Sequence, residues 1–287
     1  MKRRAFLKRS GAAGAAAMAM GAAGRLDAGE NKPKAMPTIK LGPLEVSRLI
    51  LGSNPFWGYS HQSRDRDQEM RQYHTDEVIV KVLDEAAANG ITALASPPDK
   101  RWVDLWAKYL AGGGKMKIWI AQCHGPPEKM EEEIDYAVKG GAKAVFIQGA
   151  RTEKEVGWKH FDRLRGWVER IKGHNLPAGT AAHWPEVPGE LEKRKFPTDF
   201  YFQCFYNVSR EGQWGEGERQ AAVEAIRQIE KPVVAYKILA AGRLPAQAAF
   251  EYAFEKLRRK DGVCVGIHRG DAVDHVRQNA LYTELLT

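Results

Sequence analysis

Eight short apolar runs alternate with amphipathic helical stretches along most of the chain, and this alternation constrains the fold more than any other feature. Several runs are apolar without interruption, which is typical of strands buried on both faces of a parallel sheet. The expected strands are Arg48–Ser53, Ile91–Ser96, Lys117–Cys123, Ala144–Gly149, Pro177–His183, Phe200–Asn207, Val233–Leu239 and Val263–His268. The expected helices are Asp76–Asn89, Trp102–Leu110, Pro127–Lys139, Phe161–Lys172, Pro188–Lys195, Glu216–Ile229, Ala246–Lys260 and Ala272–Leu285.

This succession predicts an α/β fold, a (β/α)8 TIM barrel, over residues 38–287. An open doubly wound sheet is the alternative, although such sheets usually have fewer strands. A short β-hairpin over Thr38–Val46, turning at Gly42-Pro43, is expected before the first strand. Residues 31–37 are interpreted as a linker that precedes this single barrel domain.

The first thirty residues have the pattern of a targeting segment. Lys2-Arg3-Arg4-Ala5-Phe6-Leu7-Lys8 is followed by a Gly/Ala-rich run from Gly11 to Ala23, which is too short for a stable membrane span. Paired arginines before Phe-Leu-Lys resemble a twin-arginine export signal. The resemblance implies the twin-arginine export machinery as a partner and a periplasmic or extracellular location.

Charge and cysteine content exclude two further classes of protein. The net charge at pH 7 is +8, and the first thirty residues contribute half of it through six basic and two acidic side chains. The remaining excess is too small to predict a nucleic-acid partner. Three cysteines without a CxxC pair predict neither a disulfide framework nor a structural zinc site.

Functional side chains of such a barrel lie at the carboxyl ends of its strands. We take His124, His183, Lys237 and His268 as candidate catalytic residues on this ground. The three histidines could instead hold a divalent metal with an open position, although no acidic residue ends a strand beside them.

Lys237 allows three interpretations. An amine in an apolar barrel mouth can form a Schiff base with a carbonyl compound. It can also bind an acidic group as a cation, or extend outward to solvent. Binding is favoured, because no partner base is obvious nearby in the sequence. Cys123 and Cys204 are interpreted as small core residues.

Candidate substrate-binding residues follow other strands: Trp57, Gln148, Trp184, Tyr206 and Asn207. The tryptophans, together with Trp214, suit stacking on sugar rings, and they could equally cap the barrel. The stretch Asn54–Tyr73 is expected to be an unstructured insertion that acts as a lid or binding loop, with its charged run exposed to solvent.

Several motifs in this order resemble the aldo-keto reductase family, over nearly the whole chain after residue 38. The opening Leu41–Leu49 and the seventh-strand segment Pro232–Gly242 match the family pattern, with Lys237 in place of a serine. Phe205-Tyr206-Asn207 with Arg210 matches its sixth-strand motif. The resemblance implies NADP as a cofactor, with Gln203, Tyr236, Arg269 and Asn279 at its binding site.

The catalytic tetrad of that family is not retained. Its aspartate, lysine and histidine align with Ala95, Cys123 and Gln148, and no tyrosine occurs at 99–101. The Ser-Asn pair that would bind nicotinamide aligns with Ala181-Ala182. Carbonyl reduction by hydride needs a general acid for the nascent alkoxide, and the aligned residues cannot supply it.

Three functions therefore remain open. We favour an exported barrel enzyme that acts on a small polar, carbohydrate-like molecule by a mechanism other than hydride transfer from NADPH. The alternatives are an NADP-dependent oxidoreductase with a rearranged site and a non-catalytic relative that binds a small molecule. Neither NADP nor a divalent metal is required or excluded by the sequence.

Overall fold

The computed structural model describes residues 35–207 and 215–287. The predicted export signal and most of the predicted linker lie outside these residues, as do Arg210 and Trp214. Within the two described ranges, no helix is both long enough and apolar enough to cross a lipid bilayer.

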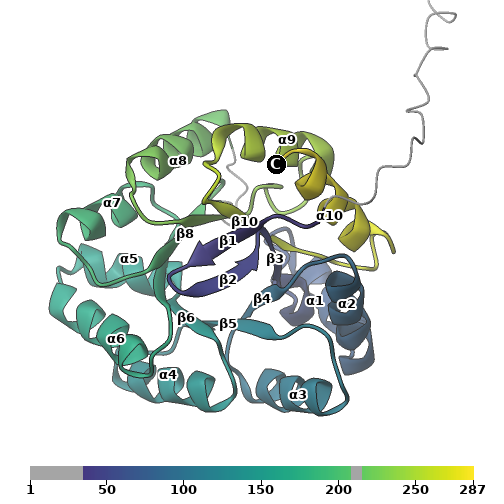
Figure 1. The fold of residues 1–287 in the computed structure, drawn as a ribbon, viewed down its shortest axis with the longest axis horizontal. Coiled ribbons are helices and arrows are strands. Elements are labelled where there is room, and N and C mark those ends of the chain that lie inside the picture. The colour runs from purple at the N-terminus through teal and green to yellow at the C-terminus, as the bar shows by residue number, and fades with distance from the viewer. Residues whose placement is uncertain (1–34, 208–214) are drawn as a thin grey trace, which may run out of the picture. The chain divides into compact units, whose positions relative to one another are not determined.

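Eight parallel strands close into a barrel, so the predicted fold is confirmed (Figure 1). Strand order around the barrel follows the sequence, and the last strand pairs with the first to close it. The strands are β3 (Leu49–Gly52), β4 (Ala93–Ser96), β5 (Ile118–Cys123), β6 (Ala144–Ile147), β7 (Ala178–Ala182), β8 (Phe200–Cys204), β9 (Val233–Tyr236) and β10 (Gly262–Gly266).

Helices surround the barrel, and most follow a strand as expected (Figure 1). They are α1 (Arg64–Tyr73), α2 (Asp76–Ala88), α3 (Lys100–Ala111), α4 (Met130–Lys139), α5 (Gly149–Gly157), α6 (Phe161–Gly173), α7 (Glu186–Lys193), α8 (Glu216–Gln228), α9 (Ala246–Lys256) and α10 (His275–Leu285). Two short 3-10 turns, η1 (Asn54–Trp57) and η2 (Pro127–Lys129), precede α1 and α4.

Side chains on each strand alternate between the barrel interior and the surrounding helices. Ile50 and Ile120 belong to the inner apolar cluster, which also holds Phe146 and Phe202. Their sequence neighbours, such as Trp119, pack in the outer cluster between strands and helices. This alternation decides which residues near the strand ends can face the barrel mouth.

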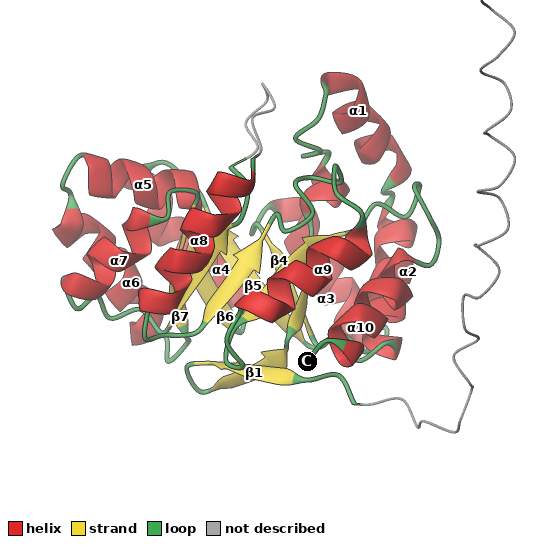
Figure 2. Cartoon of the chain, turned by 90° about the horizontal axis from the view of Figure 1, so that it is seen from above, coloured by secondary structure: helices red, strands yellow, loops and turns green. Residues whose placement is uncertain are grey.

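An antiparallel hairpin closes the amino end of the barrel, as predicted. It consists of β1 (Thr38–Leu41) and β2 (Leu44–Ser47). Ile39, Leu41 and Val46 join the inner apolar cluster. Figure 2 shows β1 at one end of the barrel and α1 at the other. Because these apolar side chains fill the amino end of the barrel, its open end is the one formed by the carboxyl ends of the strands.

The insertion after β3 is not the unstructured loop that the sequence suggested. It contains η1 and the ten-residue helix α1, whose amino end is capped by the Ser63 hydroxyl accepting from the Arg66 amide at 3.1 Å. Met70 is the buried side chain of this helix. Since one buried residue produces no apolar repeat, the pattern indicated only a solvated charged run.

Helix α5 was not predicted either, because its core-facing positions are not apolar. Glu155 is fully buried and pairs with Arg163 at 2.5 Å. Thr152 is buried beside it on the same helix. A charged group in the place of an apolar one removes the periodicity on which a helix prediction depends. The helix begins directly after β6 and brings its first turns to the barrel mouth.

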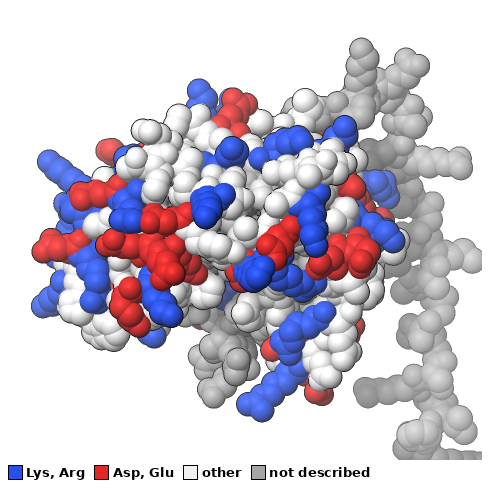
Figure 3. Space-filling view, turned by 90° about the horizontal axis from the view of Figure 1, so that it is seen from below, with Lys and Arg blue, Asp and Glu red and all other residues white. Residues whose placement is uncertain are grey.

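Charges of both signs are interspersed on the face of the molecule seen in Figure 3. Opposite charges also pair between neighbouring helices, as Arg170 on α6 does with Glu131 and Asp135 on α4. Such exposed pairs contribute little to stability. The expectation that the chain binds no nucleic acid stays a prediction.

Candidate active site

A cavity of about 520 Å³ lies at the carboxyl ends of the strands. Its apolar lining includes Ala95, Ala181, Phe146 and Phe202, and the two phenylalanine rings stack with centroids 4.3 Å apart. Polar side chains from the loops after the strands line the rest. An apolar pocket with a few convergent polar groups is typical of a small-molecule site.

The cavity brings together all four residues that the sequence proposed as catalytic: His124, His183, Lys237 and His268. It also includes one predicted substrate residue and two predicted cofactor residues, namely Gln148, Tyr236 and Asn279. The remaining six candidates are absent from its lining: Gln203, Arg269, Trp57, Trp184, Tyr206 and Asn207.

His183, directly after β7, is held by a carboxylate that the sequence pattern does not predict. The Nδ1 of its ring lies 3.2 Å from Oε2 of Glu153 on α5. The other carboxylate oxygen accepts the backbone N–H groups of His183 and Trp184. Since an ionised carboxylate only accepts, Nδ1 carries the proton in the neutral ring and Nε2 is left as the base.

Close packing fixes the approach of α5 to this pair. Gly149 is the first residue of the helix, and a Cβ added there would lie 3.0 Å from Nδ1 of His183 and 3.3 Å from the Tyr236 hydroxyl. A side chain at this position would displace the ring of His183. The strand-to-helix junction therefore has the geometry that Glu153 needs to reach His183.

Lys237 follows β9 in an unusual backbone conformation, with φ at 56°. A lysine in the left-handed region is strained by about 1 kcal/mol or more, and such strain often marks functional positions. Its Nζ lies 5.8 Å from the centre of the Tyr236 ring. The His183 ring lies 5.7 Å from the same ring, so both groups adjoin Tyr236.

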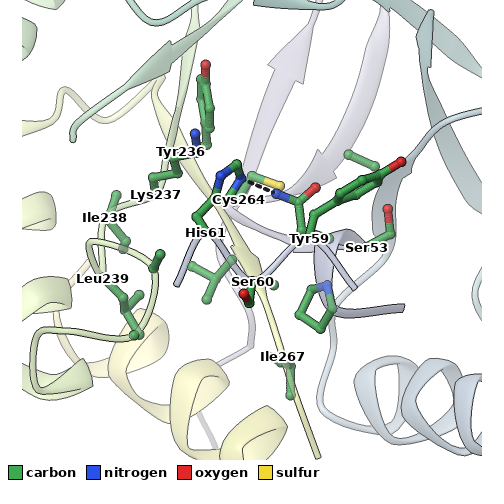
Figure 4. A pocket seen from close by; sticks show the side chains of 18 of the residues that line it. Ser53, Tyr59, Ser60, His61, Tyr236, Lys237, Ile238, Leu239, Cys264 and Ile267 are labelled. Atoms are coloured by element: carbon green, nitrogen blue, oxygen red, sulfur yellow. Dashed lines mark hydrogen bonds between the residues drawn. The ribbon is translucent and has the colours of Figure 1, made fainter. Parts of the chain in front are cut away.

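Burial lowers the pKa of Lys237, and nearby Cys204 and Glu153 oppose the shift. Within residues 35–207 and 215–287, no acidic side chain lies within ion-pair distance of its ammonium group. The ammonium group is therefore desolvated without an ion-pair partner among these residues, which makes it easier to deprotonate than an exposed lysine. Figure 4 shows the side chain beside Tyr236 and His61.

His61 belongs to the loop that crosses the cavity mouth. Burial, followed by the charges of Lys237 and His183, lowers its pKa to about 4. The ring is thus neutral at pH 7, and its Nε2 lies 3.3 Å from Asn54 Nδ2. Its backbone carbonyl accepts from Arg243 at 2.9 Å, which ties this loop to the segment after Lys237.

His268, after β10, lies in an aromatic cluster beneath α1. Its ring centre is 5.1 Å from that of Tyr73 and 5.0 Å from that of His74. Both of its nitrogens are buried without a hydrogen-bond partner among the described residues. Nε2 lies 3.6 Å from Glu69 Oε1, an ion pair only when the ring is protonated. His268 therefore packs against the end of α1 as well as lining the cavity.

His74 makes stability depend on pH. Burial lowers its pKa to about 4, with His268 and Arg101 acting in the same direction and the Met70 carbonyl opposing. The unfolded value is about 6.5, so the unfolded chain binds the proton first as the pH falls. We expect His74 to lower the free energy of unfolding by about 2 kcal/mol between pH 7 and pH 5.

Urea unfolding at the two pH values measures this loss. The variant His74→Gln lacks the titrating ring and should lose less stability over the same interval. An equal loss in both proteins would show that the proton is taken up elsewhere.

His124 occupies the exposed rim of the cavity. Glu133 on α4 accepts the backbone N–H groups of His124 and Gly125 and lies 3.4 Å from the ring. Among the described residues, no three His, Cys, Asp or Glu side chains come close enough to form a metal site. His124, His183 and His268 thus share a cavity without forming a ligand cluster.

The four residues assigned to NADP by resemblance are not gathered at one site. Arg269 pairs with Glu85 on α2. Gln203 is buried, and its amide donates to the His183 and Cys204 carbonyls at 3.4 and 3.1 Å. Of these four residues, Tyr236 and Asn279 line the cavity. The assignment of these four residues to an NADP site therefore stays a prediction, with two of them at the cavity.

Three of the expected substrate residues make contacts elsewhere. Trp57 donates to the Ser96 hydroxyl at 3.4 Å, under the guanidinium of Arg101. Tyr206 accepts from Arg219 at 3.1 Å. Asn207 donates its backbone N–H to Glu218 at 2.9 Å.

Trp184 is exposed on the outside of the cavity, with 53% of its surface accessible. The aromatic side chain at the mouth is instead Tyr59, which lines the cavity and is 55% exposed.

The position of Cys123 corrects its alignment with the tetrad lysine of the aldo-keto reductases. It is fully buried in the outer cluster and points away from the barrel interior. Gln122 and His124, its neighbours, line the cavity. The residue at the mouth in this part of β5 is therefore an amide or an imidazole, and the cysteine is a core residue as expected.

The comparisons with known proteins support the fold. No protein-family model and no curated protein matches the chain. Two provisionally named aldo-keto reductases from Pseudomonas aeruginosa are similar in structure at 17% identity. One has a TM-score of 0.62 and covers 88% of this chain and 98% of its own, and the other has 0.58, 87% and 94%.

A provisionally named deoxyribose-phosphate aldolase from Toxoplasma gondii gives a TM-score of 0.50 at 12% identity, with 81% of this chain and 91% of that chain covered. The chain is thus a TIM barrel with a distant structural resemblance to such reductases and aldolases. At these identities the likeness concerns the fold alone.

Proposed function

We propose that the cavity is the active site of an enzyme that moves a proton at the carbon next to the carbonyl of a small, sugar-like compound. The observation that carries this proposal is the junction of the Glu153–His183 pair and Lys237 around Tyr236. A base held by a carboxylate and a cation beside it are the two groups that enolisation requires.

His183 is the base in this proposal. Glu153 fixes the ring and its tautomer, so Nε2 accepts the proton from the substrate carbon. The carboxylate also stabilises the imidazolium that forms. Because the same ring can return the proton, the reaction needs no second acid.

Lys237 stabilises the negative charge that develops on the carbonyl oxygen. A cation in a site from which water is excluded has a larger effect than one in bulk water. The amides of Gln122 and Gln148, which line the cavity, suit the hydroxyl groups of a sugar-like compound. The apolar side chains of the lining suit its carbon skeleton.

This chemistry fits the proposed export through the twin-arginine pathway. It uses the substrate alone and no reducing cofactor, so it does not depend on a supply of NADPH outside the cytoplasm. The second candidate is an NADP-dependent oxidoreductase, which Tyr236 and Asn279 at the cavity favour.

Proton exchange in D₂O tests the proposal. Dihydroxyacetone and pyruvate are incubated with the purified protein, and deuterium incorporation next to the carbonyl is followed by NMR. We expect exchange in proportion to protein concentration and above the buffer rate. Quenching of intrinsic fluorescence by NADPH, measured in parallel, would support the oxidoreductase. If neither proton exchange nor fluorescence quenching is observed, the proposal is overturned and the non-catalytic binding protein is the remaining alternative.

A further inference from the structure

We propose that Lys237 acts as a nucleophile, forming an imine with the carbonyl carbon of the substrate. This inference rests on the proposed function and replaces the electrostatic role of Lys237 with a covalent one. Three observations carry it: the backbone strain at Lys237, the absence of an ion-pair partner for it among residues 35–207 and 215–287, and the proton-transfer groups in the same cavity.

The backbone fixes the direction of the amine. A lysine directly after β9 is left-handed, as are Ala240, Ala241 and Gly242 in the turn that follows. Nothing in the turn itself requires lysine there, since glycine or asparagine adopts this conformation at lower cost. The strained position places the side chain in the cavity lining instead of at the surface.

The surroundings make the Lys237 ammonium group easier to deprotonate than a lysine held in an ion pair. In a buried ion pair, a carboxylate offsets the cost of desolvating the ammonium group. Lys237 has no such partner in the described part of the chain, whereas the other half-buried lysine nearby in sequence, Lys231, lies 3.3 Å from Glu192. Burial accordingly lowers the pKa of Lys237, and a neutral amine is the form that attacks a carbonyl.

The reaction balances with the substrate and water alone. The Lys237 nitrogen attacks the carbonyl carbon, a C–N bond forms, and the carbonyl oxygen takes up a proton. The resulting carbinolamine loses that oxygen as water after a second protonation, leaving the protonated imine. Loss of the neighbouring C–H proton then gives an enamine. Addition of water reverses the sequence and releases both partners without oxidation or reduction.

The groups that such a sequence needs line the same cavity as the amine. His183 can supply and recover protons through Nε2, because Glu153 accepts from its Nδ1. His61 is neutral at pH 7, and the charges of both Lys237 and His183 contribute to its lowered pKa. Tyr236 is no proton donor in this scheme, since burial raises the pKa of its hydroxyl well above the usual value.

Reductive trapping tests the imine. The full chain is incubated with dihydroxyacetone and sodium cyanoborohydride, which reduces an imine to a stable secondary amine, and digested for mass spectrometry. We expect the adduct on the peptide that contains Lys237. Lys115, which is exposed and has no salt bridge among the described residues, is the internal control for ordinary lysine reactivity and should stay unmodified at the same pH.

Two variants separate the covalent role from a charge role. Lys237→Met keeps the volume, removes the buried charge, and should lose the adduct while melting no lower than the wild type. Lys237→Arg keeps the charge but forms no imine, and should lose proton exchange as fully as Lys237→Met. If Lys237→Arg retains exchange, the amine acts only as a cation and the inference is wrong.

The outcomes distinguish this inference from the function on which it rests. Proton exchange without an adduct on Lys237 overturns the imine and leaves the enolisation proposal standing. An adduct on Lys237 without exchange supports the reactive amine and counts against enolisation. Equal labelling of Lys115 and Lys237 would show no special reactivity and overturn the inference.

Discussion

Replacing His183 by asparagine should slow proton exchange by about 10²- to 10⁴-fold, the range expected for loss of a general base. The asparagine amide can still donate to Glu153 in place of Nδ1, so the contact between β7 and α5 is retained. What disappears is Nε2, the proton acceptor in this proposal. Exchange rates measured at saturating dihydroxyacetone isolate this loss from weaker binding.

Glu153→Gln should slow exchange about as much as His183→Asn. Its side-chain carbonyl oxygen can accept the backbone N–H groups of His183 and Trp184, and its NH₂ group then faces Nδ1 of the ring. Because Nδ1 must then accept, the ring proton moves to Nε2 and the base is lost. Melting temperatures of both variants should stay near the wild-type value, because the surrounding hydrogen bonds persist.

His174→Asn is the matched control. His174 lies 2.9 Å from Asp135, so it too is a histidine beside a carboxylate, but it caps the end of α6 away from the cavity. Its replacement should leave exchange unchanged. If His183→Asn also leaves exchange unchanged, then the base is another residue of the cavity and the role given to the Glu153–His183 pair is wrong.

The barrel was predictable because two sequence patterns indicate its strands: each strand is an apolar run, and amphipathic helical stretches separate the runs. Residues that follow those runs, such as His183 and Lys237, could be assigned to one end of the barrel without coordinates. The closed order of strands then brought them into one cavity. Topology alone accounts for this success, since carboxyl ends of parallel strands meet at one edge.

Glu153 could not be found in that way. It belongs to α5, which the sequence hides because Glu155 is buried where an apolar residue would be expected. A charge in the core is stable only with its partner, and Arg163 lies on the next helix. The local sequence pattern therefore does not predict the helix, and it gives no indication that the Glu153 carboxylate contacts His183.

Errors of one residue also matter at the strand ends. Because neighbouring side chains on β5 face opposite sides, the shift from Cys123 to Gln122 exchanges a core residue for a cavity residue. Arg269 shows a different limit, since its pairing with Glu85 on α2 depends on a contact between segments far apart in the chain. Neither outcome follows from spacing.

At the opposite end of the barrel, Asp261→Asn should destabilise the fold by about 3 kcal/mol, the lower part of the range for breaking a buried ion pair. The Asp261 side chain is fully buried and accepts the Val233 backbone N–H at 2.9 Å and the Arg258 side chain at 2.6 and 2.8 Å. It thereby joins the starts of β9 and β10.

Arg48 extends this network across the closing seam of the barrel. Its guanidinium donates to the Asp261 and Arg258 carbonyls at 2.8 and 2.9 Å, and its own carbonyl accepts from Val263 at 2.9 Å. Since Arg48 directly precedes β3, the contacts join the first and last strands. With asparagine at position 261, the guanidinium groups of Arg258 and Arg48 lose the negative charge beside them. The asparagine side chain can accept hydrogen bonds at only one of the two former oxygen positions.

Urea unfolding of Asp261→Asn and of Asp104→Asn measures the effect. Asp104 makes an exposed pair with Lys100 at 2.6 Å, so the same substitution there should change the free energy of unfolding by less than about 1 kcal/mol. Proton exchange below the unfolding transition should match the wild type in both, because neither residue touches the cavity. Equal destabilisation by the two substitutions would show that the seam does not depend on the buried carboxylate.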